Sequence, residues 1–225
     1  MIITVNVVKA FIEGLDLSSR VLSHSNNGTN TTIQVGNVFH ARPALVVDID
    51  GSNYTVISAD YSTNTLVVAG VIALPLLLTV PIPFYWHGTF MKLKNELNQI
   101  LSIDDKVPMI YLHEIVREVR KNPSRTDIRK ISDITLFFMD KAPELGATTS
   151  QQYADIITPL EKTVDLFCDS LYADRKFSDM GDIMQVNEIE WGNYTDKKGH
   201  LKTFFDARLS GIALSFALPI LKCCD

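Results

Sequence analysis

The N-terminal part of the chain alternates short apolar, β-branched runs with polar turns. The clearest runs occupy residues 44–49, 54–58 and 65–69. Asp50 and Gly51 separate the first two runs, and Asp-Gly in this position is typical of a tight hairpin because glycine accepts a positive φ. The pattern predicts a β-meander, with the polar stretch 23–30 as a mobile loop. We therefore expect residues 1–85 to form a small all-β, barrel-like unit.

After Trp86 the pattern changes to helices and longer strands. Apolar residues at helical spacing predict one amphipathic helix, N-capped by Thr89, and a second helix over residues 153–171 that is kinked by Pro159. Strands are predicted at residues 109–119, 131–139, 183–191 and 212–220. This order predicts an α+β domain over residues 86–225, with both helices packed on one face of an antiparallel sheet.

The predicted sheet has a core face and two exposed edges. In its last strand large apolar residues alternate with small ones, so we expect Phe216 to meet Phe167 of the second helix in the core. Residues 114–120 are equally consistent with a helix, because they are rich in charge. Pro219 removes a backbone donor from one edge, but the other unpaired strand groups would remain a docking surface for a neighbouring copy.

A long uncharged stretch raises the alternative of a membrane span. No Asp, Glu, Lys or Arg occurs between Asp60 and Lys92, and residues 66–86 are mostly apolar. One glycine and three prolines would break a spanning helix here: Gly70, Pro75, Pro81 and Pro83. Its valines and isoleucines favour extended chain, so the stretch is interpreted as buried strands and no membrane partner is expected.

Composition narrows the classes of function. The formal net charge is -5 and the isoelectric point is about 5.5, which gives no general basic field for nucleic acid. Cys168 lies in a helical pattern, while Cys223 and Cys224 are adjacent, so neither a disulfide framework nor a zinc site is indicated. The N-terminus lacks the features of a signal peptide. The expected setting is a reducing cytoplasm.

Motifs that would indicate catalysis are not found in the sequence. It has no phosphate loop, dinucleotide fingerprint, nucleophile elbow or two-histidine zinc motif. We expect no enzymatic activity, no cofactor and no metal. Asp48, Asp50 and Asn53 could be calcium ligands, but the EF-hand spacing fails and a hairpin explains them better.

Three weaker candidates each have a simpler structural explanation. His113 and Glu114 are adjacent in a predicted strand and would point to opposite faces, which favours a structural histidine. His87 precedes a helix start that could hold an anion, although a hinge with a helix cap is the simpler interpretation. Glu188 and Glu190 could act as a carboxylate pair, but a solvated rim is favoured.

Six basic residues crowd the connection between the first two strands of the α+β domain. They are Arg117, Arg120, Lys121, Arg125, Arg129 and Lys130. Glu118 and Asp127 dilute this cluster, yet it remains a positive arm in an acidic chain. It is either an ordinary exposed loop or an intersubunit contact with an acidic patch, and it could also touch passing DNA.

Five segments resemble a family of structural proteins from phages of Bacteroidetes-type hosts. They are 84–97 (FYWHGTFMKLKNEL), 106–114 (KVPMIYLHE), 133–142 (DITLFFMDKA), 186–200 (VNEIEWGNYTDKKGH) and 209–220 (LSGIALSFALPI). The resemblance covers about residues 84–220. In the order of its elements this region is also similar to phage tail-terminator and head-completion proteins.

The resemblance implies a virion structural protein without an active site. It would form homo-oligomeric rings of six or twelve copies in the neck or tail, as a head-to-tail connector, terminator or stopper. Its expected partners are other neck, tail or portal-associated proteins, with transient contact to channel DNA. Its expected location is the virion, and the host cytoplasm during assembly. The β unit at 1–85 is a departure, because a minimal tail terminator lacks it.

Two other classes stay open. A small β-barrel that binds saccharide or nucleic acid, with an accessory α+β domain, would need aromatic residues on a polar strand face, for which Tyr54 and Tyr61 are the central candidates. A hydrolase with an unfamiliar site would need polar groups that converge from distant segments.

Overall fold

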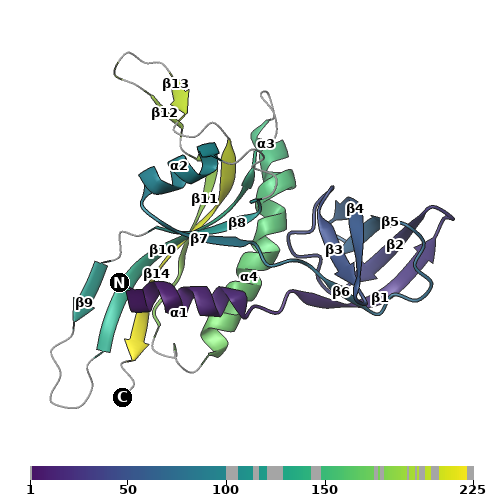
Figure 1. Cartoon of the computed structure of the whole chain (residues 1–225), viewed down its shortest axis with the longest axis horizontal. Coiled ribbons are helices and arrows are strands. Elements are labelled where there is room, and N and C mark those ends of the chain that lie inside the picture. The colour runs from purple at the N-terminus through teal and green to yellow at the C-terminus, as the bar shows by residue number, and fades with distance from the viewer. Residues whose placement is uncertain are drawn as a thin grey trace. The chain divides into compact units, whose positions relative to one another are not determined.

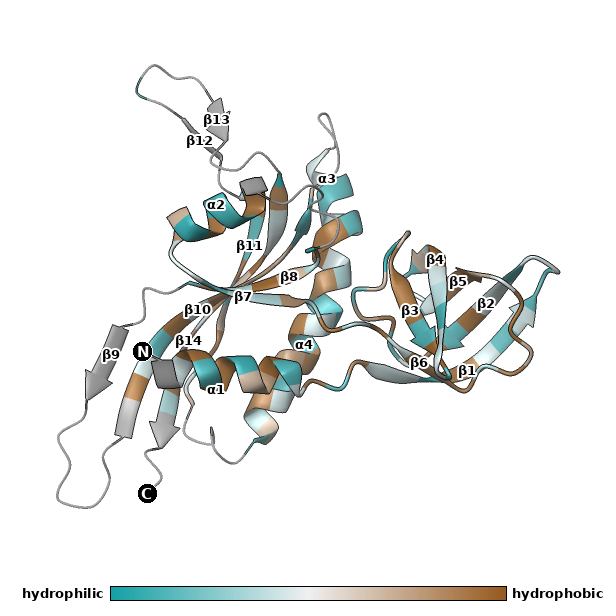
Figure 2. Cartoon of the chain, in the orientation of Figure 1, coloured by the Kyte–Doolittle hydropathy of each residue, from teal (hydrophilic) through white to brown (hydrophobic). Residues whose placement is uncertain are grey.

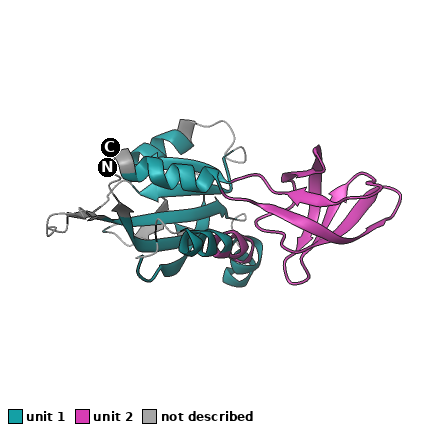
Figure 3. Ribbon diagram, turned by 90° about the horizontal axis from the view of Figure 1, so that it is seen from below, with its two compact units in different colours: residues 1–14, 83–157, 166–225 teal, residues 15–82, 158–165 magenta. Residues whose placement is uncertain are grey.

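The computed structural model of the chain divides into two compact units (Figures 1 and 3). Unit 1 comprises residues 1–14, 83–157 and 166–225, and unit 2 comprises residues 15–82 and 158–165. The structure describes residues 2–99, 106–113, 117–120, 129–142, 148–174, 177, 180–191, 193–195, 197, 201–203 and 208–221. The predicted α+β class is confirmed: an N-terminal six-stranded barrel is followed by a mixed sheet with helices.

Unit 2 is built around a closed antiparallel barrel. Its strands are β1 (Ser18–Asn26), β2 (Asn30–Val35), β3 (Val46–Ile49), β4 (Ser52–Asp60), β5 (Thr65–Ala69) and β6 (Leu77–Thr79). They close in the order β1-β2-β5-β4-β3-β6, which leaves no strand at an edge. Alternate residues such as Ile33, Leu66 and Leu78 are fully buried and fill the interior.

The predicted Asp-Gly hairpin joins β3 to β4. Ile49 pairs with Ser52, and the two residues between them have φ of 52° at Asp50 and 84° at Gly51. Positive φ at both central residues matches the primed turns that suit the twist of a hairpin. Most of the stretch 23–30 is strand and not the predicted loop, because β1 runs to residue 26 and β2 begins at residue 30, which leaves residues 27–29 as the turn. Polar residues 23–26 belong to exposed strand, which the periodicity of apolar residues cannot detect.

The first residues are helical, which corrects the prediction of an all-β unit over 1–85. Helix α1 (Ile2–Glu13) belongs to unit 1 and buries Val5, Val8 and Ile12 at helical spacing. Its β-branched composition disfavours a helix, but burial of this face outweighs the weak intrinsic propensity. Residues 84–85 also belong to unit 1, in strand β7 (Phe84–Gly88).

Unit 1 contains a six-stranded mixed sheet. Its strands are β7, β8 (Met109–His113), β9 (Arg117–Arg120), β10 (Arg129–Lys141), β11 (Met184–Trp191) and β14 (Leu209–Leu221). The order is β11-β14-β10-β8-β7, with β9 paired to β10 beside β8. The sheet was expected to be antiparallel, but β7 and β8 are parallel, joined by helix α2 (Phe90–Gln99). Strands β12 (Asn193–Thr195) and β13 (Leu201–Thr203) form a separate ribbon.

The second predicted helix is divided by a π-helical turn. It consists of α3 (Thr149–Gln152), η2 (Tyr153–Ile157) and α4 (Thr158–Ala173), and Thr148 caps it through a capping box with Gln151. Pro159 lies in the first turn of α4, directly after η2, which is where a proline is tolerated. None of the described helices is long and apolar enough to cross a membrane.

The helices of unit 1 cover opposite faces of the sheet, which corrects the prediction that both pack on one face. Leu93 and Leu97 of α2 pack with Met139, whereas Phe167 of α4 contacts Phe138 with 5.3 Å between ring centroids. Consecutive strand residues point to opposite faces. The sequence pattern could not assign α2 to a face because strands buried on both sides are apolar throughout.

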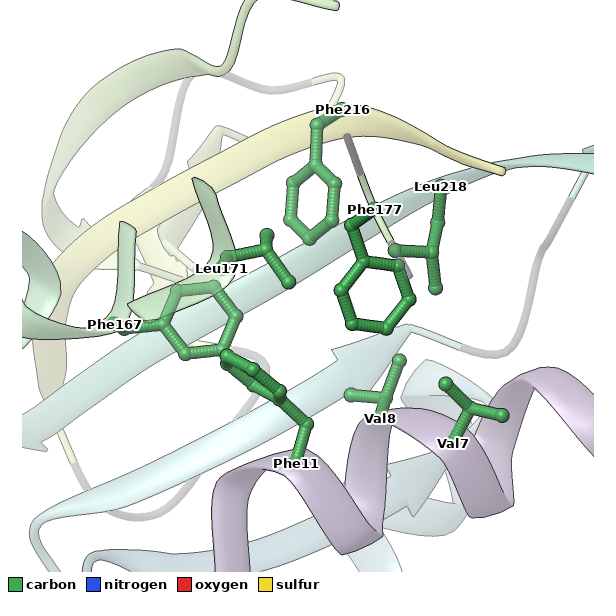
Figure 4. A pocket seen from close by; sticks show the side chains of 8 residues that line it. All are labelled: Val7, Val8, Phe11, Phe167, Leu171, Phe177, Phe216 and Leu218. Carbon is green, nitrogen blue, oxygen red and sulfur yellow. The ribbon is translucent and has the colours of Figure 1, made fainter. Parts of the chain in front are cut away.

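Phe167 and Phe216 meet between α4 and β14, as predicted. Their ring centroids lie 6.3 Å apart, and Phe11 of α1 closes the cluster at 5.4 Å from Phe167 in an edge-to-face arrangement. Figure 4 shows these rings around a cavity that Leu171 and Phe177 also line. At about 10 Å³ and with apolar walls, the cavity is part of the core and holds no ligand site.

Candidate assembly surfaces

The outer side of strand β11 is an open sheet edge. It pairs with β14 on one side, and no described strand lies on the other. Met184 and Val186 are 64% and 48% exposed, and residues 184–187 contain neither charge nor proline. Edge strands are normally protected by such residues, and β11 carries charge only further on, at Glu188 and Glu190. Residues 184–187 are therefore the part of this edge that is open to another strand.

The neighbouring acidic residues do not form a regular carboxylate pair. Glu188 pairs with Gly211, and the register then shifts before Trp191. A bulge at this point breaks the alternation on which a Glu188–Glu190 pair depends. Asn187, one residue before, has a buried Oδ1 with no hydrogen-bond partner among the described residues. The edge therefore offers both main-chain groups and an unused side-chain acceptor.

The predicted basic cluster maps onto strands β9 and β10. Arg117 and Arg120 belong to β9, Arg129 and Lys130 open β10, and Lys121 and Arg125 lie outside the described residues. Arg117 pairs in register with Asp133, but Arg120 is directly opposite Lys130. Like charges at directly opposite positions of a sheet are unfavourable, so the register does not pair all of these basic residues with acidic ones.

The barrel carries an exposed apolar ridge beside β1. This surface is called the barrel ridge below, and its five residues are 44% to 68% exposed: Leu22, Val71, Leu74, Leu76 and Leu77. Figure 2 shows the hydrophobic stretch that leads into β6. The backbone beneath the ridge is fixed, because the Val21 N–H donates to the Leu76 carbonyl at 2.9 Å and Asn26 Nδ2 donates to the Ile72 carbonyl at 2.9 Å. Grouped exposed apolar residues commonly mark contact surfaces.

The two aspartates of the hairpin, Asp48 and Asp50, accept hydrogen bonds from backbone N–H groups. Asp48 Oδ1 accepts from the Gly51 N–H at 3.0 Å, and the Asp50 carboxylate accepts from the N–H groups of Leu76 at 2.8 Å and Leu77 at 3.0 Å. These contacts support the hairpin interpretation over calcium binding. In the part of the chain that the structure describes, no three His, Cys, Asp or Glu residues are grouped to hold a metal ion.

The buried histidine of the barrel unit, His40, was missed in the sequence. Its Nδ1 lies 2.9 Å from Thr163 Oγ1, in the part of α4 that belongs to unit 2. Burial lowers the pKa of His40 from 6.5 to about 4, and nearby Arg42 adds to this effect, whereas the Pro81 backbone opposes it. A neutral, enclosed imidazole has a structural role. The sequence gives one indication of burial, which is that His40 follows Val38 and Phe39 and precedes Ala41.

The two histidines that were weak candidates for a site, His87 and His113, lie on strands β7 and β8. Burial lowers the pKa of His113, and Glu114 lies outside the described residues. His87 is exposed, and Thr89 caps α2 as predicted, with Oγ1 accepting from the Lys92 N–H at 3.4 Å. Gly88 must be glycine, because a Cβ there would lie 2.4 Å from the Trp86 ring.

A small cavity lies between α2 and the start of β8. Its volume is about 90 Å³, and it is lined by Phe84, Trp86, Leu93, Glu96, Leu97, Lys106 and Met109. Lys106 Nζ lies 4.3 Å from the centroid of the Phe84 ring, a cation–π distance. Cofactor and drug-sized sites are several times larger, so this cavity fits at most a few waters or one small side chain.

The two aromatic residues that were candidates for ligand binding, Tyr54 and Tyr61, make contacts within the barrel unit. The Tyr61 hydroxyl donates to the Ala41 carbonyl at 2.7 Å. The Tyr54 ring lies 3.6 Å from the position of a Cβ added to Gly70, so it covers a glycine of positive φ. Base or sugar stacking needs exposed ring faces. These contacts give the binding-module alternative no specific support.

Comparison with known proteins adds no relative. A scan against protein-family models finds no match, and a search of curated proteins finds no significant similarity.

Proposed function

We propose that the protein is a bacteriophage virion structural subunit that forms a ring in the neck or tail, as a head-to-tail connector, tail terminator or stopper. It acts by assembly with further copies of itself and with other neck, tail or portal-associated proteins. The resemblance over residues 84–220 supports the phage setting. Its location is the virion, after assembly in the host cytoplasm.

The open edge at β11 is the observation that carries the proposal. Its main-chain groups are unpaired on one side, two apolar side chains are exposed, and none of the usual protective residues occurs at 184–187. A monomer that works alone gains nothing from such an edge, since it invites pairing with other chains. A subunit that assembles uses the same groups as its interface.

Native mass spectrometry and negative-stain microscopy of the purified protein test the ring. The expected result is one closed species of six or twelve copies with a central opening. Immunogold labelling of phage particles should place the protein at the junction of head and tail or along the tail. A monomer in solution together with unlabelled particles would exclude the proposal.

Contact with channel DNA is a minor part of the proposal. The chain is acidic, so binding would be confined to the basic cluster, with Arg117, Arg120, Arg129 and Lys130 as its described members. Such contacts depend steeply on salt, because each neutralised phosphate releases counterions. Fluorescence anisotropy with duplex DNA should show weak binding that disappears at physiological salt.

A further inference from the structure

We infer that strand β11 of one copy pairs with strand β9 of the next copy, so that the sheet of unit 1 continues from subunit to subunit. This inference rests on the proposed ring. Both strands have one side that no described strand covers. Strand addition at an open edge supplies affinity through main-chain hydrogen bonds, and the side chains on the joined strands select the partner.

Charge selects this pair of edges. Strand β11 contains Glu188 and Glu190 and follows Asp182, whereas β9 contains Arg117 and Arg120 with one acidic residue, Glu118, and pairs with β10, which begins with Arg129 and Lys130. Two copies of β11 paired about a twofold axis would bring acidic residues together, and two copies of β9 would bring arginines together. A head-to-tail contact joins opposite charges instead, and repetition of such a contact closes a ring when the rotation from one subunit to the next closes.

Strand direction agrees with head-to-tail pairing. Strand β9 is antiparallel to β10, β10 is antiparallel to β14, and β14 is antiparallel to β11. Strands β9 and β11 of one copy therefore run in opposite directions. A neighbour that continues the sheet without being inverted presents β9 antiparallel to β11, the stronger and more common arrangement.

The pleat of the sheet restricts the register. Val119 pairs with Ile131 and Arg117 with Asp133, while Val186 pairs with Ala213 and Glu188 with Gly211, all on one face of the sheet. Setting Val119 opposite Val186 keeps this face continuous and places Arg117 opposite Glu188. A slip of one residue would exchange the faces.

The same register explains the unused acceptor on the edge. Glu118 would face Asn187 and Arg120 would face Gln185, so that Arg120 lies diagonally across from Asn187. Long side chains reach diagonal neighbours in a sheet, and Asn187 Oδ1 has no partner among the described residues. An arginine donor from the next copy would satisfy it.

Disulfide trapping tests the register. In one copy β14 and β10 separate β11 from β9, and Val186 aligns with Phe137 of β10 whereas Val119 aligns with Ile131. Positions 119 and 186 are therefore more than about 20 Å apart and cannot form a disulfide within one copy. The V119C/V186C variant should therefore give, after mild oxidation, a ladder of covalent multimers on a non-reducing gel. The V119C/N187C variant is one residue out of register and should give little ladder. The unchanged chain, with its own three cysteines, sets the background.

Charge exchange tests the partner. R117E and E188R should each weaken association at least about tenfold, and the two together should restore most of it. Rings that persist in every variant without a ladder would overturn the strand pairing while leaving the ring function intact. A parent chain that is monomeric in solution and missing from particles would overturn the ring function itself.

Discussion

The barrel of unit 2 has no strand edges, whereas the mixed sheet of unit 1 has open ones. In unit 2 the strands close in a circle, so every strand has two neighbours. In unit 1 the path ends at β11 and β7, and β9 branches from β10. Closure removes edges by itself, whereas an open sheet needs protective residues or a partner. The barrel therefore has no strand edge to offer to another strand, while the sheet can present a row of main-chain hydrogen-bonding groups at β11.

The largest expected effect is in the core of unit 1. Phe167→Ala should lower the free energy of unfolding by about 3–5 kcal/mol, because the ring is buried between Phe11, Phe138 and Phe216. Both tryptophans, Trp86 and Trp191, lie in unit 1, so their fluorescence during urea unfolding follows this unit.

Tyr172→Ala on the same helix is the matched control for this change. Tyr172 is 52% exposed, and we expect its replacement to alter the midpoint little. Equal midpoints for the Phe167 and Tyr172 variants would contradict the packing between α4 and the sheet.

The second prediction concerns acid and the barrel unit. The pKa of His40 is lowered to about 4 in the folded state, so the unfolded chain binds a proton more readily. Stability is therefore full above pH 6.5 and falls as the pH drops from 6.5 to 4, by up to about 3 kcal/mol. Urea unfolding at a series of pH values, followed by NMR signals of barrel residues, measures this loss.

His40→Gln should flatten that pH dependence, because glutamine does not titrate. His24→Gln, a change on the exposed side of β1, is the control and should leave the slope as it is in the parent chain. A slope that survives in the His40 variant would assign the acid sensitivity to other groups.

A smaller effect is expected at the turn that joins β3 and β4. Gly51 has φ of 84°, a region that costs a residue with a Cβ about 1–2 kcal/mol. Gly51→Ala should destabilise the barrel by that amount, although an added Cβ would meet no atom within 4 Å. Gly181→Ala, at a glycine without positive φ and also in open space, should be neutral in thermal unfolding. If both variants melted like the parent, backbone strain would not be the reason for this glycine.

Elements with a strong periodic pattern were predictable from the sequence. Strand β5 has the predicted bounds 65–69, the Asp50–Gly51 hairpin is present, and Phe167 meets Phe216. In each case local pattern and tertiary packing favour the same conformation. Helix α1 was missed, because its β-branched residues suggest a strand and only packing in unit 1 makes it helical.

The candidate surfaces were only partly predictable. The basic cluster is visible as composition, but its pairing with Asp133 and Lys130 depends on a strand register that sequence alone does not set. The open edge at β11 depends on sheet order, which brings together strands that are distant in the chain. His40 became a candidate only through burial, because one histidine among apolar residues has no distinctive spacing.

The smallest effect on stability is expected at the barrel ridge, where the effect on assembly should be larger. Leu74 and Leu76 are 68% and 60% exposed, so replacing both with serine should change the free energy of unfolding by no more than about 0.5 kcal/mol. Because the barrel has no open edge, exposed apolar side chains are its candidate contact surface, and the ridge groups more of them than the exposed Val46, Ile57 and Ile82 elsewhere on unit 2.

Leu78→Ser is the matched control, since Leu78 lies on β6 beside the ridge but is fully buried. Loss of a buried leucine should cost about 2–5 kcal/mol and unfold the barrel unit. Circular dichroism separates the two variants by stability, and native mass spectrometry compares their oligomers. A ridge variant with normal stability and weakened rings would show that the barrel contributes to assembly through side chains. Rings of normal strength would leave assembly to the open sheet of unit 1.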